Sequence, residues 1–122
     1  MLPFAGGTAR CASPAYVRDN AHAPLLAAAY ANFAASLPPG AGVSRLNPSG
    51  YVESQGAFTR RVAEEMRARL GLPCAFELAE QTEFSEPRIR INTDPLDARA
   101  LGLDEASAWD EMAQYYRGLY AR

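Results

Sequence analysis

The sequence predicts an α+β domain in which helices pack against a small sheet, and three observations lead to this class. An apolar stripe with the four-residue spacing of one helix face is formed by Phe58, Val62, Met66 and Leu70. Residues 74–79 and 88–92 each alternate apolar with polar side chains, as half-buried strands do. The chain has 122 residues, of which 48% are hydrophobic, so it is long enough for one domain with its own core.

The beginning of the chain differs in pattern from the rest. Residues 1–13 are small, Gly-containing and aperiodic, so residues 1–20 are expected to form an extended N-terminal arm, whereas residues 21–122 are expected to form a single domain. The first helix is predicted from Pro24 to Leu37, where apolar residues recur at helical spacing. Almost no charge falls on any face of this helix, so one side could be covered by the sheet and the other by a second molecule.

The helix that bears the apolar stripe has its own start and stop signals. Ser54 is the predicted N-cap, because its hydroxyl can accept a hydrogen bond from an amide two or three residues further on. Gly71 supplies a left-handed C-terminal residue, and Pro73 prevents the helix from continuing. Before this helix, residues 43–47 are a candidate strand that runs into the turn sequence Asn-Pro-Ser-Gly at 47–50.

The last predicted strand, 88–92, places its isoleucines on one face and Arg88 and Arg90 on the other. Two arginines on one strand face could bind an anion or an RNA phosphate, or could form pairs with Glu residues across the sheet. A turn then leads to a final helix, predicted to begin within 104–107. Its apolar face is formed by Trp109, Met112, Ala113, Tyr116 and Tyr120. This face either belongs to the core or partly meets a partner.

The composition argues against several classes of function. The net charge is −2 and all twelve basic residues are Arg. An acidic chain without a basic run is a poor candidate for sequence-independent binding of nucleic acid. No apolar run reaches the roughly 18 residues of a membrane span, so we expect no direct membrane insertion.

The residues that usually carry redox or metal chemistry are sparse. Cys11 and Cys74 lie far apart and outside any C-x-x-C motif, so a redox pair and a zinc site both lack their minimum pattern. We interpret Cys74 as a buried hydrophobic residue and Cys11 as a loop thiol, with a disulfide between them as the alternative. His22, the single histidine, is interpreted as solvated or capping rather than as a metal ligand or catalytic group.

The order of elements from Val43 to Asn92 resembles a mitochondrial thioredoxin-like family. One branch of that family is an accessory subunit of respiratory complex I, and the others are proteins of the mitochondrial ribosome. The positions that carry the resemblance are Asn47, Gly50, Gly56, the apolar stripe of the central helix and Pro87-Arg88. The chain departs from the pattern in two ways: it lacks the cysteines common in the complex I branch, and its fourth strand is indistinct.

The resemblance implies a two-layer α/β arrangement with a mixed sheet of three or four strands and an extra N-terminal helix. In that fold, residues 74–79 and 88–92 would flank the strand at 43–47, with a right-handed crossover through the central helix. Pro87 would mark the fold with a cis peptide bond. The absence of cysteine at 50–54 removes the thiolate needed for disulfide exchange, so the fold would be present without its redox chemistry.

The function that the resemblance implies is that of a non-catalytic accessory subunit, which acts by contacts with other protein subunits and needs no cofactor or metal. The expected assembly is complex I on the matrix side of the mitochondrion, and the alternative is a mitochondrial ribosomal protein that contacts rRNA. The expected partner-binding residues are Arg45, Tyr51, Arg88, Arg90, Trp109, Tyr115 and Tyr120. If the resemblance is wrong, a cytoplasmic ligand-binding domain or small enzyme remains. Its site would be formed by Arg45, Asn47, Ser49, Tyr51 and His22.

Overall fold

The computed structural model describes residues 7–120, except for the side chain of Tyr120, and shows a small mixed α+β fold. Its helices are α1 (Ala23–Ser36), α2 (Gln55–Leu70) and α3 (Glu105–Tyr120). Its strands are β1 (Ala9–Cys11), β2 (Val17–Asn20), β3 (Pro48–Ser49), β4 (Tyr51–Ser54), β5 (Phe76–Leu78) and β6 (Asp94–Pro95). The predicted α+β class is therefore confirmed at this level.

The strands of the described region form three separate pairs rather than one sheet. β1 runs parallel to β5, β2 runs antiparallel to β4, and β3 runs parallel to β6. A single parallel bridge between Val17 and Ile89 adds the segment around Ile89 to the β2–β4 pair. Two of these strands, β1 and β2, come from the first twenty residues, so this part of the chain is extended but is paired with strands from later in the sequence.

The predicted strand at 43–47 is not formed, and this expectation was wrong. Residues 41–47 have no regular structure, and the Val43 side chain is 89% exposed. Gly40 and Gly42 both have positive φ, which breaks the chain direction just before the candidate strand. The strand that leads into α2 is β4 instead, and its partner is β2 from the N-terminal region.

The two later strands are also shorter and paired differently from the expectation. The segment 74–79 contributes only β5, and the segment 88–92 contributes only the bridge at Ile89. Neither flanks 43–47. Every peptide bond between described residues is trans, including the one before Pro87, so the expected cis bond is absent. Asn92 was expected to belong to the last strand, but its backbone amide donates a hydrogen bond of 3.0 Å to the Asp19 carboxylate instead.

Helix α2 has the ends that the sequence predicts. Ser54 is extended (φ −62°, ψ 152°) and its hydroxyl accepts a hydrogen bond from the Ala57 amide at 3.1 Å. Gly71 ends the helix in the left-handed conformation with φ 68°. The positions chosen for N-cap and C-cap are thus both confirmed, because local chemistry decides them.

Removing the cap is expected to weaken the fold by a measurable amount. Ser54→Ala should lower the free energy of unfolding by about 1 kcal/mol, because one amide in the first turn of α2 loses its hydrogen bond. Urea titration followed by circular dichroism measures this change. Ser44→Ala is the matched control, since Ser44 lies exposed in the loop after α1 and should change stability little. Equal stability of both variants would show that the cap contributes nothing.

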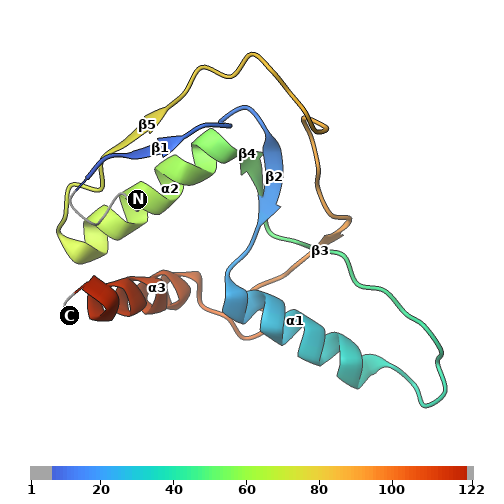
Figure 1. The fold of residues 1–122 in the computed structure, drawn as a ribbon. Coiled ribbons are helices and arrows are strands. Elements are labelled where there is room, and N and C mark those ends of the chain that lie inside the picture. The colour runs from blue at the N-terminus through green and yellow to red at the C-terminus, as the bar shows by residue number, and fades with distance from the viewer. Residues whose placement is uncertain (1–6, 121–122) are drawn as a thin grey trace.

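The core lies between α2 and α3 (Figure 1) and includes Cys74. Its buried members are Ala63, Met66, Cys74, Trp109 and Ala113. In Figure 1, the β1–β5 pair lies along one side of α2 and α3 lies along the opposite side. Cys74 is fully buried, as interpreted from the sequence, whereas Cys11 lies in β1 rather than in a loop. Both thiols are free, so the alternative disulfide is not formed.

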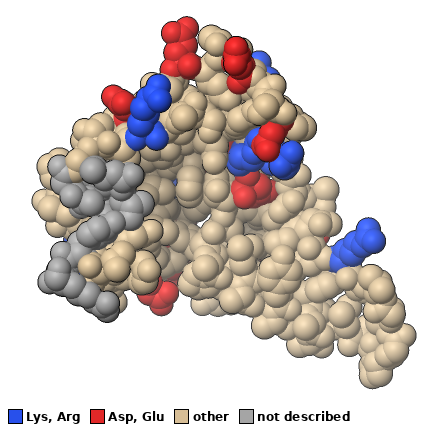
Figure 2. Space-filling model, in the orientation of Figure 1, with Lys and Arg blue, Asp and Glu red and all other residues tan. Residues whose placement is uncertain are grey.

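Helix α1 projects from this body together with the loop that follows it (Figure 1). Only Leu25 and Ala29 of the helix are buried. Figure 2 shows almost no charged side chain over the projection, in agreement with the absence of Asp, Glu, Lys and Arg from residues 21–44. Among the described helices, none combines the length and apolar character that a bilayer crossing requires.

Candidate functional site

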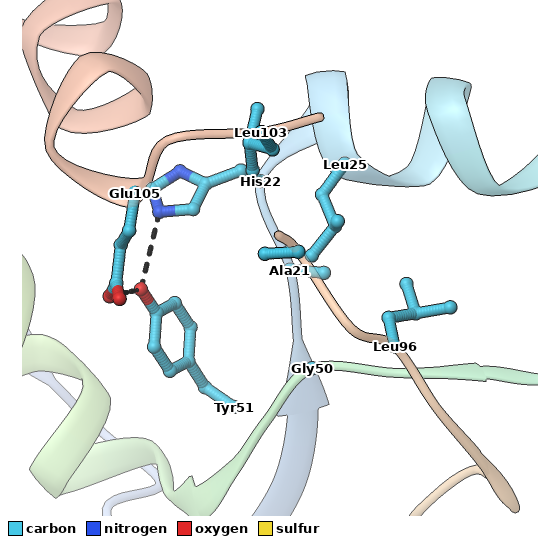
Figure 3. A pocket seen from close by; sticks show the side chains of 9 residues that line it. Ala21, His22, Leu25, Gly50, Tyr51, Leu96, Leu103 and Glu105 are labelled. Carbon is cyan, nitrogen blue, oxygen red and sulfur yellow. Dashed lines mark hydrogen bonds between the residues drawn. The ribbon is translucent and has the colours of Figure 1, made fainter. Parts of the chain in front are cut away.

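A pocket of about 150 Å³ lies where the chain leaves β2, enters β4 and begins α3. The pocket has polar residues at one end, namely His22, Tyr51 and Glu105. The remainder of its wall consists of Ala21, Leu25, Gly50, Leu96, Ala98 and Leu103. Figure 3 shows the three polar side chains converging on one point, with Leu25 and Leu96 on the other side of the space.

Local structure explains why the three polar groups meet. His22 directly precedes α1, Tyr51 is the first residue of β4, and Glu105 is the first residue of α3. Because β4 pairs with β2, Tyr51 lies opposite Asn20, two residues before His22. The chain reversal at 96–104 then brings the start of α3 beside them.

The hydrogen bonds of this cluster fix the positions of its protons. The Tyr51 hydroxyl donates its only proton to a carboxylate oxygen of Glu105. The Nε2 atom of His22 lies 3.3 Å from the Tyr51 oxygen, which can then only accept. We therefore assign a proton to Nε2, so that the neutral imidazole is left with Nδ1 as an acceptor. His22, Tyr51 and Glu105 form one hydrogen-bonded chain that ends on a carboxylate.

Aromatic rings hold His22 and Tyr51 from behind. The Trp109 ring meets the imidazole edge-on with centroids 4.5 Å apart, and it stacks with the Tyr51 ring at 6.2 Å. The guanidinium of Arg61 lies 4.5 Å from the centre of the Tyr51 ring, and Glu53 holds Arg61 there through bonds of 2.8 and 3.0 Å. The cluster is therefore fixed by packing as well as by hydrogen bonds.

This environment keeps both titratable rings neutral. Burial lowers the pKa of His22, against the opposite pull of the Glu105 and Glu65 carboxylates. Burial also raises the pKa of Tyr51, and the hydrogen bond to Glu105 raises it further, since a phenolate would face a carboxylate. At neutral pH the polar end of the pocket thus contains two neutral rings beside one carboxylate.

The expectation that His22 is solvated or capping was wrong. The residue is only 7% exposed, and its side chain makes no capping hydrogen bond to α1. The physical reason is the indole of Trp109, which covers the imidazole and lies far along the chain. Glu105 was not among the residues proposed from the sequence. Its position in the first turn of the last helix is common for an acidic residue, so it gave no signal of a site.

The buried histidine predicts a pH dependence of stability. Because the native pKa lies below the unfolded value of about 6.5, the unfolded chain takes up a proton first as the pH falls. The free energy of unfolding should therefore fall as the pH falls through and below ~6.5, by at most about 1.4 kcal/mol per pH unit. Denaturant titrations between pH 5 and 8 measure it. His22→Gln should lose this slope, and an unchanged slope in that variant would contradict the assignment.

The remaining residues of the proposed ligand site do not join the pocket. Arg45 and Asn47 are exposed, and the Asn47 backbone pairs with Asp94. Ser49 is buried in β3, and its side chain is hydrogen-bonded to the Asp19 carboxylate. Burial raises the pKa of Asp19, but the hydrogen bonds from Gly50, Ser49 and Asn92 outweigh this effect and lower the pKa. Of the five residues in that hypothesis, the structure brings together His22 and Tyr51.

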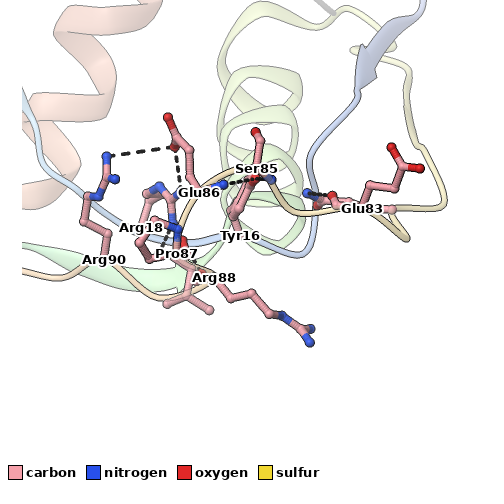
Figure 4. Close-up of polar contacts among 10 residues, drawn as sticks. Tyr16, Arg18, Glu83, Ser85, Glu86, Pro87, Arg88 and Arg90 are labelled. Carbon is pink, nitrogen blue, oxygen red and sulfur yellow. Dashed lines mark hydrogen bonds and ion pairs between the residues drawn. The ribbon is translucent and has the colours of Figure 1, made fainter.

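The arginine-bearing segment is held against β2 by Arg18 (Figure 4). The Arg18 guanidinium bonds the Glu86 carboxylate at 3.1 Å and the Pro87 and Arg88 carbonyls at 3.2 and 3.3 Å. Arg90 lies 3.9 Å from the same carboxylate. Its acidic partner thus comes from the preceding loop rather than from across a sheet.

The other expected partner-binding residues lie in different places. Arg88 is exposed, with its guanidinium 4.3 Å from the centre of the Phe84 ring. The last helix was expected to bury its apolar face in the core or to present part of it to a partner. Trp109 is a core residue, so the first interpretation holds at this position. Tyr115 is 64% exposed. The side chain of Tyr120 lies outside the described part of the chain.

No three His, Cys, Asp or Glu side chains among residues 7–120 come together in a way that could hold a metal ion. Comparison of the chain with protein-family models, curated proteins and solved structures found no match. The function must therefore be inferred from the chain itself.

Proposed function

We propose that the protein is a non-catalytic subunit that binds other proteins of a larger assembly. The observation that carries this proposal is α1, an uncharged helix that projects from the body (Figure 1). Only two of its residues, Leu25 and Ala29, are buried. A helix that is apolar on all sides is normally buried, because exposing its outer face to water is unfavourable. The outer face of α1 therefore fits a surface that a partner covers.

The accessible surface of the chain supports the same proposal. The chain of 13.2 kDa exposes 7962 Å², whereas a monomeric protein of that mass exposes about 6,400 Å². The excess accessible surface, about 1,500 Å², is larger than the roughly 800 Å² that one partner contributes to a standard interface. A subunit whose fold is completed by its neighbours has such an open shape.

A second surface of this kind is the edge formed by residues 88–92. The bridge to Val17 uses the Arg88 carbonyl and the Arg90 amide, at 2.7 and 3.1 Å. The amide and carbonyl of Ile89 then point to the opposite edge, as parallel pairing requires. The side chains of Ile89 and Ile91 are 64% and 49% exposed. A strand of a partner protein could pair with this edge.

The narrower proposal is that the fold is a thioredoxin-like variant and that the assembly is mitochondrial, with complex I ahead of the ribosome. Its support is the sequence resemblance over residues 43–92, together with the acidic charge and the absence of Lys. The acidic side chain of Glu86 beside Arg18 and Arg90 also fits a protein partner better than RNA phosphates.

Co-purification with quantitative mass spectrometry tests the proposal. The variant Ala27→Glu/Ala31→Glu places two charges one turn apart on the exposed face of α1 and keeps good helix formers. Its control, Ala57→Glu/Ala68→Glu, also replaces two exposed alanines by glutamate, here on α2. Both should keep the wild-type circular dichroism spectrum. A defined set of partners should be lost from the α1 variant alone.

The identity of the partners separates the narrower alternatives. Recovery of respiratory-chain subunits supports complex I, and recovery of ribosomal proteins supports the ribosomal alternative. Partners of another kind would overturn the mitochondrial part of the proposal. An equal recovery with all three proteins, or no stoichiometric partner at all, would overturn the role of α1.

A further inference from the structure

We propose that the pocket at His22, Tyr51 and Glu105 binds a small organic amine, with its ammonium group at the carboxylate and its apolar body among the leucines. This inference is independent of the subunit role, because α1 presents its exposed face away from the pocket and contributes only Leu25 to the wall. Three properties of the pocket favour such a ligand: its hydrogen-bonding groups, its charge and its size.

The hydrogen-bonding groups at the polar end have a surplus of acceptors. The Tyr51 proton is committed to Glu105, and the Nε2 proton of His22 is directed at Tyr51. The free capacity that remains at this end consists of the other lone pairs of the Glu105 carboxylate. A ligand that donates hydrogen bonds fits this end, whereas a ligand that only accepts them does not.

The charge at this end is negative and is not balanced by a residue of the pocket wall. Glu105 is the only charged residue among the lining residues. Arg61 interacts with Glu105 through its charge, but its guanidinium is hydrogen-bonded to Glu53. Arg69 is bonded to Glu65 and Asp110. A cation is therefore favoured over a neutral donor, and an anion is disfavoured, since hydrogen bonds between charged groups are the stronger ones.

The other end limits the body of the ligand. Leu25, Leu96, Leu103 and Ala21 line the space in Figure 3. Ala98 completes this apolar wall, and none of these side chains can form a hydrogen bond. A cavity of about 150 Å³ lined by apolar groups accepts a molecule of the size of benzene. The ligand class is thus a primary amine with one small ring or a short branched chain.

Benzylamine is a suitable probe, and benzyl alcohol and benzoate are its neutral and anionic counterparts. Trp109 is the only tryptophan in the chain and lies 4.5 Å from His22, so its fluorescence reports on the polar end of the pocket. Isothermal titration calorimetry gives the affinity independently. We expect saturable binding of benzylamine, binding of benzyl alcohol weaker by about tenfold, and no binding of benzoate.

Three variants of the full chain localise the binding. Glu105→Gln should weaken benzylamine about tenfold and leave benzyl alcohol almost unchanged. Ala98→Leu should abolish binding of both, because it fills the apolar end while leaving the charge in place. Glu64→Gln removes a charge from an exposed position of α2 and should change nothing.

Two outcomes would overturn the proposal. One is that wild-type protein binds the alcohol or benzoate as tightly as the amine, or binds none of them. The other is that amine binding survives both Glu105→Gln and Ala98→Leu. Thermal unfolding of each variant identifies any that fails to fold. If Glu105→Gln does not fold, binding by Ala98→Leu serves as the test. Loss of protein partners in the α1 variant plays no part in this result, so the two proposals can fail separately.

Discussion

Trp109→Ala is expected to lower the free energy of unfolding by about 3–5 kcal/mol. Trp109 is 2% exposed and belongs to the cluster of α2 and α3 residues around Met66. Its ring also covers His22 and stacks with Tyr51. The substitution therefore opens a cavity in the core and removes the support of the polar cluster at once. Urea titration followed by far-ultraviolet circular dichroism measures the loss.

Tyr115→Ala is the matched control for this prediction. It truncates an aromatic side chain on the same helix, but one that is 64% exposed, so a loss of only about 0.5 kcal/mol is expected. If Trp109→Ala is too unstable to titrate, Trp109→Phe should show an intermediate loss, since a phenyl ring fills part of the space. Similar losses for Trp109→Ala and Tyr115→Ala would mean that the core is not located at Trp109.

The helices could be predicted from the sequence because their signals are local. The spacing of the α2 stripe, the Ser54 hydroxyl and the left-handed Gly71 all act within one or two turns of the same helix. The first helix was placed to within one residue at each end for the same reason. The burial of the α2 stripe was predicted less well than its helical structure, since Met66 is the only residue of the stripe that is fully buried.

The strand pairs could not be predicted because pairing depends on distant segments. β4 pairs with β2 from the first twenty residues, a stretch whose sequence has no alternation of polar and apolar side chains. The candidate site failed for a related reason. The sequence around His22 is typical of a surface residue, and only the fold shows that the Trp109 indole covers it. Glu105 belongs to the site because the Tyr51 hydroxyl donates a hydrogen bond to it, and the sequence does not indicate this contact. Sequence patterns do not encode such contacts.

Gly50→Ala is expected to destabilise the fold by about 1–3 kcal/mol or more, because the added methyl group would clash with Asn20 and Ala21 at the end of β2. Gly50 lies between β3 and β4, where the chain passes directly over the end of β2. A Cβ atom at this position would lie 2.5 Å from the Asn20 carbonyl oxygen and 2.8 Å from Cβ of Ala21. Neither atom can move without displacing β2. The bond from the Gly50 amide to the Asp19 carboxylate, at 2.6 Å, would be strained as well.

Gly118→Ala makes the same change where the structure leaves room, and it should have the opposite sign. Gly118 lies in α3, and a Cβ atom added there would meet no described neighbour within 4 Å, so alanine should raise stability by about 0.5–1 kcal/mol through its helix propensity. Denaturant titration compares the two variants directly. Because Gly50 also lines the pocket, its alanine variant should shift the fluorescence of Trp109 in the native state. A Gly50→Ala protein of wild-type stability would show that β4 does not pass this close to Asn20, and the position of Tyr51 beside His22 and Glu105 would then lose its structural basis.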